Sequence, residues 1–350
     1  MFSTEFQLAV DCCQQRFARR NPGRIAELGA VADWPRSLRL ARRHRIQALV
    51  WQSLSEAGVS PPAAVADALC ADAGLIAEHN LRAAVECARV LETFGSAGIA
   101  VLFIKGLTVS KLAYGHAFVK MSHDIDVLVA DDAIAAAAAE LDRLGYVLVI
   151  PAVPRQSRQF ERWHAKRKES VWRSPDGLHL ELHGRLADSA GLIPGIGVHS
   201  PRQEVAVAPG IVLPTLAPDE LFAYLCVHGA SSAWFRLKWI TDFAALAADC
   251  PPGEIERLYR RSQQLGAGRA AAQALLLANR IYGTPTVPGL ERQPIARWLA
   301  AAAARQLLRE DEPTERRFGT ATIHLTQAFL LPGPRFLVRD LARQISERVG

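Results

Sequence analysis

Residues 101–129 read Val101-Leu-Phe-Ile-Lys-Gly-Leu-Thr-Val-Ser-Lys-Leu-Ala-Tyr-Gly-His-Ala-Phe-Val-Lys-Met-Ser-His-Asp-Ile-Asp-Val-Leu-Val129. The apolar run Ile99–Ile104 predicts a buried strand, because short continuous apolar runs are typical of strands covered on both faces. Lys105-Gly106 ends this strand, and Leu107–Tyr114 then has the pattern of a short helix. Ile125–Val129 predicts a second buried strand. This stretch therefore predicts an α/β core, and the rest of the chain is interpreted around it.

The sequence on either side of this core is mostly helical. Residues 1–95 have helical apolar spacing, and helices resume at Ala217, where Asp219 and Glu220 suit the positive end of a helix dipole. Between these flanks we expect a helix at 131–144, strands at 146–150, 170–173 and 178–183, and a hairpin over 205–213. Further helices are expected at 236–248, 253–282, 291–309, 320–330 and 336–348.

These elements predict an α+β fold, in which a small mixed sheet is flanked by N-terminal and C-terminal helical segments. A chain of 350 residues is long enough to bury a large core and to form more than one domain. We expect three regions, namely an N-terminal helical region at 1–97, an α/β core at 98–215 and a C-terminal helical domain at 216–350.

The composition restricts the class of protein. Half of the residues are hydrophobic and the net charge of +6 is small for the length, which excludes an intrinsically disordered chain. The first residues lack the pattern of a signal peptide and no window is apolar enough to span a membrane, so we expect a cytoplasmic protein without a membrane partner. The 6 cysteines include no CxxC pair, and we expect four of them to be buried thiols in a reducing compartment. The positive charge alone fits nucleic acid, an acidic membrane surface or a phosphate-bearing substrate.

Asp124 and Asp126 are the most informative residues of the chain. They stand at positions i and i+2 of the second predicted strand, so their side chains point to the same face. Two carboxylates at the mouth of a buried strand repel each other unless a cation neutralises them. Mg²⁺ binds one or two carboxylates together with substrate phosphates, which suits phosphoryl or nucleotidyl transfer. An isolated Asp-x-Asp pattern also fits a plain strand entrance at the surface.

Two further features favour a phosphate site. Lys105-Gly106 lies where a strand ends and a helix begins, and backbone N–H groups at such a place hold phosphates while the lysine adds a positive charge. Glu181 alternates with the leucines of its predicted strand and so faces away from them. A neighbouring strand would bring it beside the aspartates, as a metal ligand or as the base for an acceptor hydroxyl. A single strand glutamate also fits a solvated position.

This pattern resembles the nucleotidyltransferases of the DNA polymerase β superfamily, and more closely the bacterial group called uncharacterised nucleotidyltransferase family proteins. The resemblance rests on Lys105-Gly106, Tyr114, Lys120, Asp124-Ile-Asp126 and Glu181-Leu-His183. The flanks around Ala41-Arg-Arg-His44 and His228…Trp239-Ile-Thr-Asp242 also look like the helical flanks of the family, so the resemblance spans roughly residues 35–245.

The resemblance implies a metal-dependent nucleotidyltransferase built on a small polymerase β-like core. The residues that it assigns to the metal, Mg²⁺ or Mn²⁺, are Asp124, Asp126 and Glu181, and we assign nucleotide binding to Lys105, Gly106, Lys120 and Ser122. The expected reaction moves a nucleoside monophosphate from a nucleoside triphosphate such as ATP to an acceptor and releases pyrophosphate. The acceptor class stays open between a small molecule, a peptide or protein, and an RNA end, and an extended nucleic-acid interface is not expected.

Histidines and basic residues near this pattern have two interpretations each. The basic run 155–168 fits contact with a triphosphate, and it fits a solvated loop or helix face equally well. Further candidates for the site are His164, Arg167, His179 and His183. A carboxylate and histidine set would also suit Zn²⁺ or Mn²⁺. The alternative for each of these four is a structural or exposed position.

Two other functions stay open from the sequence. A nucleotide-binding or partner-binding protein with a catalytically decayed site is favoured by Leu107 and Lys120, which depart from the residues usual in the family. A basic RNA-binding helical protein would make the Asp-x-Asp pattern incidental. The three acidic positions favour the enzyme, because such a cluster is electrostatically unfavourable without a metal.

Overall fold

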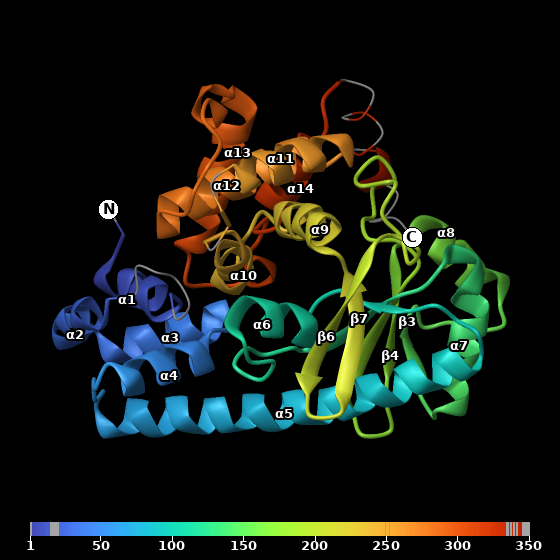
Figure 1. Cartoon of the computed structure of the whole chain (residues 1–350), viewed down its shortest axis with the longest axis horizontal. Helices are drawn as coiled ribbons and strands as arrows, with labels where there is room; N and C mark the ends of the chain where they lie inside the picture. Colours follow the sequence, from blue (N-terminus) through green and yellow to red (C-terminus); the bar gives the residue numbers. More distant parts are fainter. Residues whose placement is uncertain are drawn as a thin grey trace. The chain divides into compact units, whose positions relative to one another are not determined.

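The structure, a computed structural model, describes residues 2–14, 21–248, 250–251, 253–333 and six further positions between 336 and 344. Its contacts divide the chain into two compact units, whose elements are labelled in Figure 1. Unit 1 combines Met1–Leu75 with Phe222–Gly350, and unit 2 is Ile76–Leu221. The division into three regions stays a prediction, and the helix expected at 336–348 lies largely outside the described residues.

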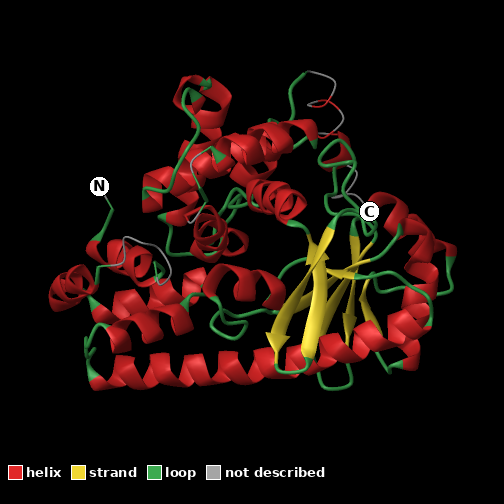
Figure 2. Ribbon diagram, in the orientation of Figure 1, coloured by secondary structure: helices red, strands yellow, loops and turns green. Residues whose placement is uncertain are grey.

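Unit 1 is helical throughout its described residues (Figure 2). Its helices are α1 (Thr4–Cys12), α2 (Pro22–Val31), α3 (Trp34–His44), α4 (Gln47–Glu56), α10 (Leu237–Ala248), α11 (Glu254–Gln264), α12 (Gly268–Tyr282), α13 (Pro294–Leu307) and α14 (Ala321–Gln327), with short 3₁₀ turns at Leu290–Arg292 and Pro313–Glu315. Two helices, α5 (Ala63–Ser96) and α9 (Pro218–Ser231), have residues in both units.

Local sequence explains where these helices begin and end. Asp33 caps α3, since its Oδ1 accepts the N–H of Arg36 at 3.0 Å, and a proline follows in the first turn. The expectation of one continuous helix over 253–282 was wrong. The chain leaves α11 at Gly266, whose φ of +85° is incompatible with a right-handed helix, and α12 starts two residues later.

Unit 2 contains the strands of the described chain, and the sheet is mixed. Its elements after α5 are β1 (Leu102–Phe103), α6 (Leu107–Tyr114), β2 (Asp124–Leu128), a 3₁₀ turn (Asp131–Ala133), α7 (Ile134–Arg143), β3 (Val147–Ile150), α8 (Arg158–Lys166), β4 (Glu169–Arg173), β5 (His179–His183), β6 (Arg202–Ala208) and β7 (Ile211–Leu216). Five strands form one sheet in the order β1-β2-β5-β4-β3, and β6 pairs with β7 in a separate hairpin. Within the sheet β2 and β5 are parallel, and the other neighbouring pairs are antiparallel. The predicted α+β fold with a small mixed sheet is therefore confirmed.

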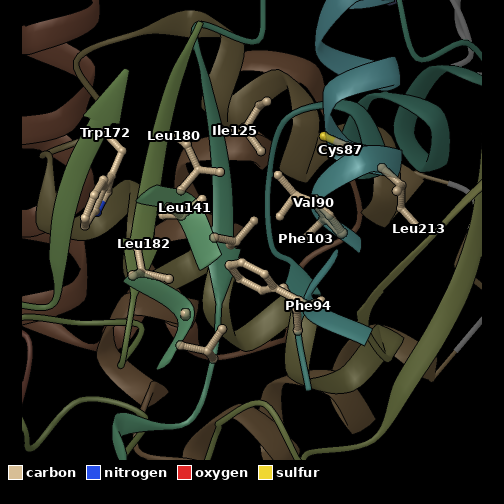
Figure 3. Close-up of a cluster of buried hydrophobic side chains, with 14 of the residues drawn as sticks. Cys87, Val90, Phe94, Phe103, Ile125, Leu141, Trp172, Leu180, Leu182 and Leu213 are labelled. Carbon is tan, nitrogen blue, oxygen red and sulfur yellow. The ribbon is translucent and has the colours of Figure 1, made fainter. Parts of the chain in front are cut away.

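The core of unit 2 lies on one face of this sheet. Alternate residues of β2 and β5, among them Ile125, Leu180 and Leu182, point into a cluster with buried side chains of α5 and α7 (Figure 3). Trp172 of β4 and Phe103 of β1 are buried in the same cluster. Because strand side chains alternate, the intervening residues of β2 and β5 all point to the other face.

Two expectations about local structure need correction or addition. The strand expected over Ile99–Ile104 is regular only at Leu102–Phe103, because β1 has one neighbour, β2, and the turn at Gly106 follows at once. The basic run 155–168 contains the helix α8, which hydrophobic periodicity did not predict. Its N-cap is Ser157, whose Oγ accepts the N–H of Phe160, and Phe160 is a core residue.

No helix among the described residues is both long and apolar enough to cross a membrane. Four cysteines are buried as expected, namely Cys12, Cys13, Cys87 and Cys226.

Candidate active site

Three of the predicted acidic residues meet because of the register between β2 and β5. The parallel pairing places Asp124 opposite His179 and Asp126 opposite Glu181. Registered residues of neighbouring strands point to the same face, which here is the face opposite the core. Asp126 and Glu181 are therefore neighbours, although 55 residues of sequence separate positions 126 and 181.

Lys105 and His183 complete this cluster. The Lys105 ammonium lies 2.5 Å from Asp126 Oδ1 and 3.7 Å from Glu181 Oε2. His183 Nε2 lies 3.3 Å from the same Asp126 oxygen and 3.2 Å from the same Glu181 oxygen. His183 is the least exposed of the four, with 1% of its side chain accessible. Two carboxylates are thus held together by one ammonium and one imidazole.

Asp124 stands at the rim of the cluster. Its side chain is 36% exposed, against 7% for Asp126, and His179 Nδ1 lies 3.8 Å from its Oδ1. Burial, together with the negative charges of Glu181 and Asp126, raises the pKa of Asp124 to about 6. The two aspartates of one strand therefore differ in both access and proton affinity.

The pKa values of the two inner carboxylates are lowered instead. Burial favours the neutral acid at Asp126, but the Lys105 ammonium and the hydrogen bond with His183 outweigh it and hold the pKa of Asp126 far below its usual range. Burial and Asp126 oppose ionisation of Glu181, yet His183 and Lys105 leave its pKa lowered as well. Both inner carboxylates are ionised at neutral pH, which is the state that a metal ion requires.

The other ring nitrogen of His183, Nδ1, also lies next to a carboxylate. The antiparallel pairing of β4 with β5 places Glu169 opposite His183, and Glu169 Oε2 lies 3.3 Å from His183 Nδ1. Glu169 is ion-paired with Lys168. Burial and Lys168 lower the pKa of His183, but Glu169 and the hydrogen bonds with Asp126 and Glu181 raise it overall. Carboxylates therefore face both ring nitrogens.

The turn after β1 leads directly into the helix α6, as the sequence predicted. Gly106 is the N-cap of α6 and has a φ of +66°, which favours glycine. A Cβ atom at Gly106 would lie 2.3 Å from Ser122 Oγ, so the two chain segments touch here. Residues of both segments, with Asp124 and Asp126, line a small cleft that is open to solvent. Backbone N–H groups at the start of a helix beside a lysine are suited to an anion.

Residues of α5 hold the segment that precedes the aspartates. Asn80 Nδ2 donates to the carbonyl of Lys120 at 2.8 Å, and its Oδ1 accepts the N–H of Ser122 at 3.1 Å. His79 Nε2 lies 2.7 Å from the carbonyl of Ser122. Asn80 is fully buried, so these bonds replace water and fix the backbone that leads into β2.

The remaining predicted residues lie around this cluster. Ser122 Oγ donates to the carbonyl of Asp124 at 3.2 Å, and Lys120 is only 5% exposed. His164 packs against Phe160, and burial followed by the charges of Arg185 and His183 lowers the pKa of His164 to about 4. Arg167 lies over the Trp163 ring. The roles of these four residues and of His179 in a reaction stay predictions.

The donor set at the centre fits a divalent cation. One ligand atom each from Asp126, Glu181 and His183 lies within 4.8 Å of the other two. Ligands at about 2.1 Å from an octahedral ion are about 3.0 Å apart when adjacent, close to the distances of 3.2 and 3.3 Å from His183 Nε2 to the two carboxylates. Carboxylate oxygens with one imidazole nitrogen suit Mg²⁺ less well than a first-row transition ion.

Sequence reasoning missed Asn80, His79 and Glu169. A polar residue on the buried side of α5, between Ile76 and Ala83, is the signal that would have singled out Asn80. The alternation along its strand predicts which way the Glu169 side chain points. Only the register of β4 with β5 shows that Glu169 lies beside His183. No pattern within either segment reveals these partners.

Comparison with known proteins identifies a family for this chain. The model of one family, described as uncharacterised nucleotidyltransferase, matches residues 30–283, which is well over half of the chain. The match includes both strands that carry the acidic residues, together with Lys105 and Gly106. Among curated proteins no match was found. The chain therefore belongs to the uncharacterised nucleotidyltransferase family.

Proposed function

We propose that this protein is a metal-dependent nucleotidyltransferase that moves a nucleoside monophosphate from a nucleoside triphosphate to an acceptor. The observation that carries the proposal is the register of β2 with β5, which places Asp126 beside Glu181 and next to Lys105. Membership of a nucleotidyltransferase family supports the same reaction class. A cation site beside a helix start is the combination that a triphosphate requires.

In this proposal the residues of the cluster divide the work. Asp126 and Glu181 would hold the metal, and Asp124 at the more exposed rim would be a further ligand. A bound divalent ion would neutralise charge on the phosphates. Lys105 and the N–H groups after Gly106 bind and orient the triphosphate. The acceptor oxygen forms a new bond to the α-phosphorus, the bond to pyrophosphate breaks, and the acceptor proton passes to a nearby base, for which Glu181 and Asp124 are the candidates.

The test uses the full-length chain with each nucleoside triphosphate and Mg²⁺ or Mn²⁺. Nucleotide binding is measured by calorimetry, and pyrophosphate release is measured over a panel of small-molecule, peptide and RNA acceptors. The variant Asp124→Asn/Asp126→Asn is expected to lose metal-dependent nucleotide binding by at least about 100-fold, which corresponds to about 2.7 kcal/mol. The matched control is Asp132→Asn/Asp176→Asn, which makes the same charge change at exposed positions.

The outcomes separate the functions that the sequence left open. Unchanged metal-dependent nucleotide binding in Asp124→Asn/Asp126→Asn would reject the proposal. Tight binding without pyrophosphate release over the whole panel would favour a nucleotide-binding protein with a decayed site. RNA binding that ignores both aspartates would favour the RNA-binding alternative.

A further inference from the structure

His183 is the most deeply buried polar side chain of the cluster, and carboxylates surround it in a way that is unusual for a structural histidine. Its side chain is 1% exposed, and a carboxylate oxygen lies 3.2 to 3.3 Å from each ring nitrogen. Nδ1 has this close contact with Glu169 but no hydrogen bond of good geometry. A histidine placed only for packing has no need of acidic groups at both edges.

The two ring nitrogens face different groups. On the β2 side the register places Leu128 opposite His183, and Nε2 of the ring lies 3.3 Å from Asp126 and 3.2 Å from Glu181. Because β5 is antiparallel to β4, Nδ1 faces Glu169, which lies on the far side from the cluster. The ring therefore separates an inner pair of carboxylates from one outer carboxylate.

This order of groups is typical of a metal-bound histidine. A ligating imidazole almost always donates its other N–H to a carboxylate, a carbonyl or water, which fixes the tautomer and the ring orientation. Here Glu169 is in the position of that outer partner, and its ion pair with Lys168 in turn limits its movement. A metal ion would take the place of the proton that Nε2 shares with the two inner carboxylates in the metal-free protein. The neutral ring would then carry its proton on Nδ1, on the side of Glu169.

We propose that His183 is a ligand of the metal, oriented by Glu169, and that the site takes a divalent transition-metal ion of the Mn²⁺ class in preference to Mg²⁺. Imidazole nitrogen suits first-row transition ions, whereas Mg²⁺ prefers oxygen ligands and retained water. The inference rests on the proposed function, because it assumes that the Asp126 and Glu181 pair binds the metal. It goes beyond that function in naming a nitrogen ligand, its positioning residue and the class of ion.

The decisive measurement detects the nitrogen ligand directly. The full-length protein is loaded with Mn²⁺, and electron spin echo envelope modulation is used to detect coupling between the ion and a ¹⁴N nucleus. We expect nitrogen coupling of an imidazole ligand in the parent protein and its loss in His183→Gln. The matched control is His179→Gln, at the rim of the same cluster, which should keep the coupling.

The metal preference gives a second readout. Competition between Mn²⁺ and Mg²⁺ should show at least tenfold preference for Mn²⁺ in the parent, and His183→Gln should reduce that ratio. Glu169→Ala should weaken Mn²⁺ binding by about 10- to 100-fold, the usual effect of losing an outer partner. Glu169→Gln keeps an acceptor oxygen and should restore much of the affinity, which loss of packing alone would not explain.

Two negative results have different meanings. Mn²⁺ that binds tightly without nitrogen coupling would overturn the assignment of His183 and leave the carboxylate site of the proposed function intact. Failure of the folded parent to bind Mn²⁺ or Mg²⁺, with or without a nucleoside triphosphate, would overturn the proposed function and this inference with it.

Discussion

The two faces of the β2 and β5 pair share one strand register but carry different kinds of side chain. On one face Ile125, Leu180 and Leu182 are buried in the core of unit 2. On the other face, Asp126, Glu181 and His183 form a polar cluster whose possible ligand atoms lie within 4.8 Å of one another. Alternation along a strand puts a polar residue next to each core residue, so the apolar face holds the polar face in position. We therefore expect substitutions on the core face to change stability, and substitutions on the polar face to change ligand binding.

The largest expected effect tests the apolar face. Leu141 of α7 is fully buried in the core cluster, and Leu141→Ala should lower the free energy of unfolding by about 2–5 kcal/mol because it removes buried methyl groups and leaves a cavity. Urea denaturation measures the loss. Mn²⁺ affinity of the folded variant should stay within about twofold of the parent.

The matched change on the polar face is His179→Ala. This side chain is 48% exposed, and the free energy of unfolding should change by less than about 0.5 kcal/mol. Similar losses of stability in the two variants would contradict the division between a stabilising face and a binding face.

The next effect concerns the turn between β1 and α6. Gly106→Ala puts a side chain at a left-handed φ of +66°, and the new Cβ would lie 2.3 Å from Ser122 Oγ. We expect the resulting strain in this turn to cost about 1–3 kcal/mol. Nucleoside triphosphate affinity, measured by calorimetry, should fall by about 5- to 100-fold. Gly210→Ala is the control, since Gly210 has a φ of +75° with nothing within 4 Å of its Cβ position, and it should leave the affinity unchanged. Equal effects of the two substitutions would remove the turn from the binding site.

A smaller effect is expected at Lys105. Its ammonium lies 2.5 Å from Asp126 and competes with a metal ion for the same charge. Lys105→Met should raise Mn²⁺ affinity in the absence of nucleotide by about 1 kcal/mol, or about fivefold, and should lower nucleotide affinity. Lys111→Met on α6 is the control, because Lys111 donates to the carbonyl of Gly115 instead. A fall in Mn²⁺ affinity would mean that Lys105 is needed to keep the carboxylates in place.

The smallest effect concerns the pH dependence of Asp124. Its pKa is raised to about 6 by burial and by Glu181 and Asp126, so ionisation is less favourable in the folded state than in the unfolded state. The metal-free protein should lose stability as the pH rises from about 4 through 6, and the penalty is complete above pH 6. Asp124→Asn removes it, but solvent screens a side chain that is 36% exposed, so we expect a gain below about 1 kcal/mol at pH 8.

Urea unfolding at pH 4 and pH 8 measures this difference. Asp132→Asn, which makes the same chemical change at an exposed position, is the control. A gain at pH 4 as large as that at pH 8 would show that the effect of Asp124→Asn does not come from ionisation. In the parent protein, Mn²⁺ affinity should rise between pH 5 and 7, because a carboxylate must lose its proton to bind a metal.

The sequence alone determined which residues of each strand share a face and which residues carry charge. The alternation around Ile125 and Leu180 predicted that Asp124, Asp126 and Glu181 share the polar side of their strands, since side-chain direction is a local property of the backbone. Local patterns also located α6 at Leu107–Tyr114 and the glycine before it. Alternation could not indicate which strands are neighbours.

Only the tertiary structure decided which distant groups meet. The pairing of β5 with both β2 and β4 brings Asp126 and Glu169 to opposite edges of His183, and Asn80 reaches the backbone of Ser122 from α5. In unit 1, the N–H of Leu237 donates to His44 Nδ1 at 3.1 Å, which links the two separate parts of the sequence that form this unit. Such contacts depend on strand order and helix packing, which are fixed by the summed burial of many side chains rather than by any short segment.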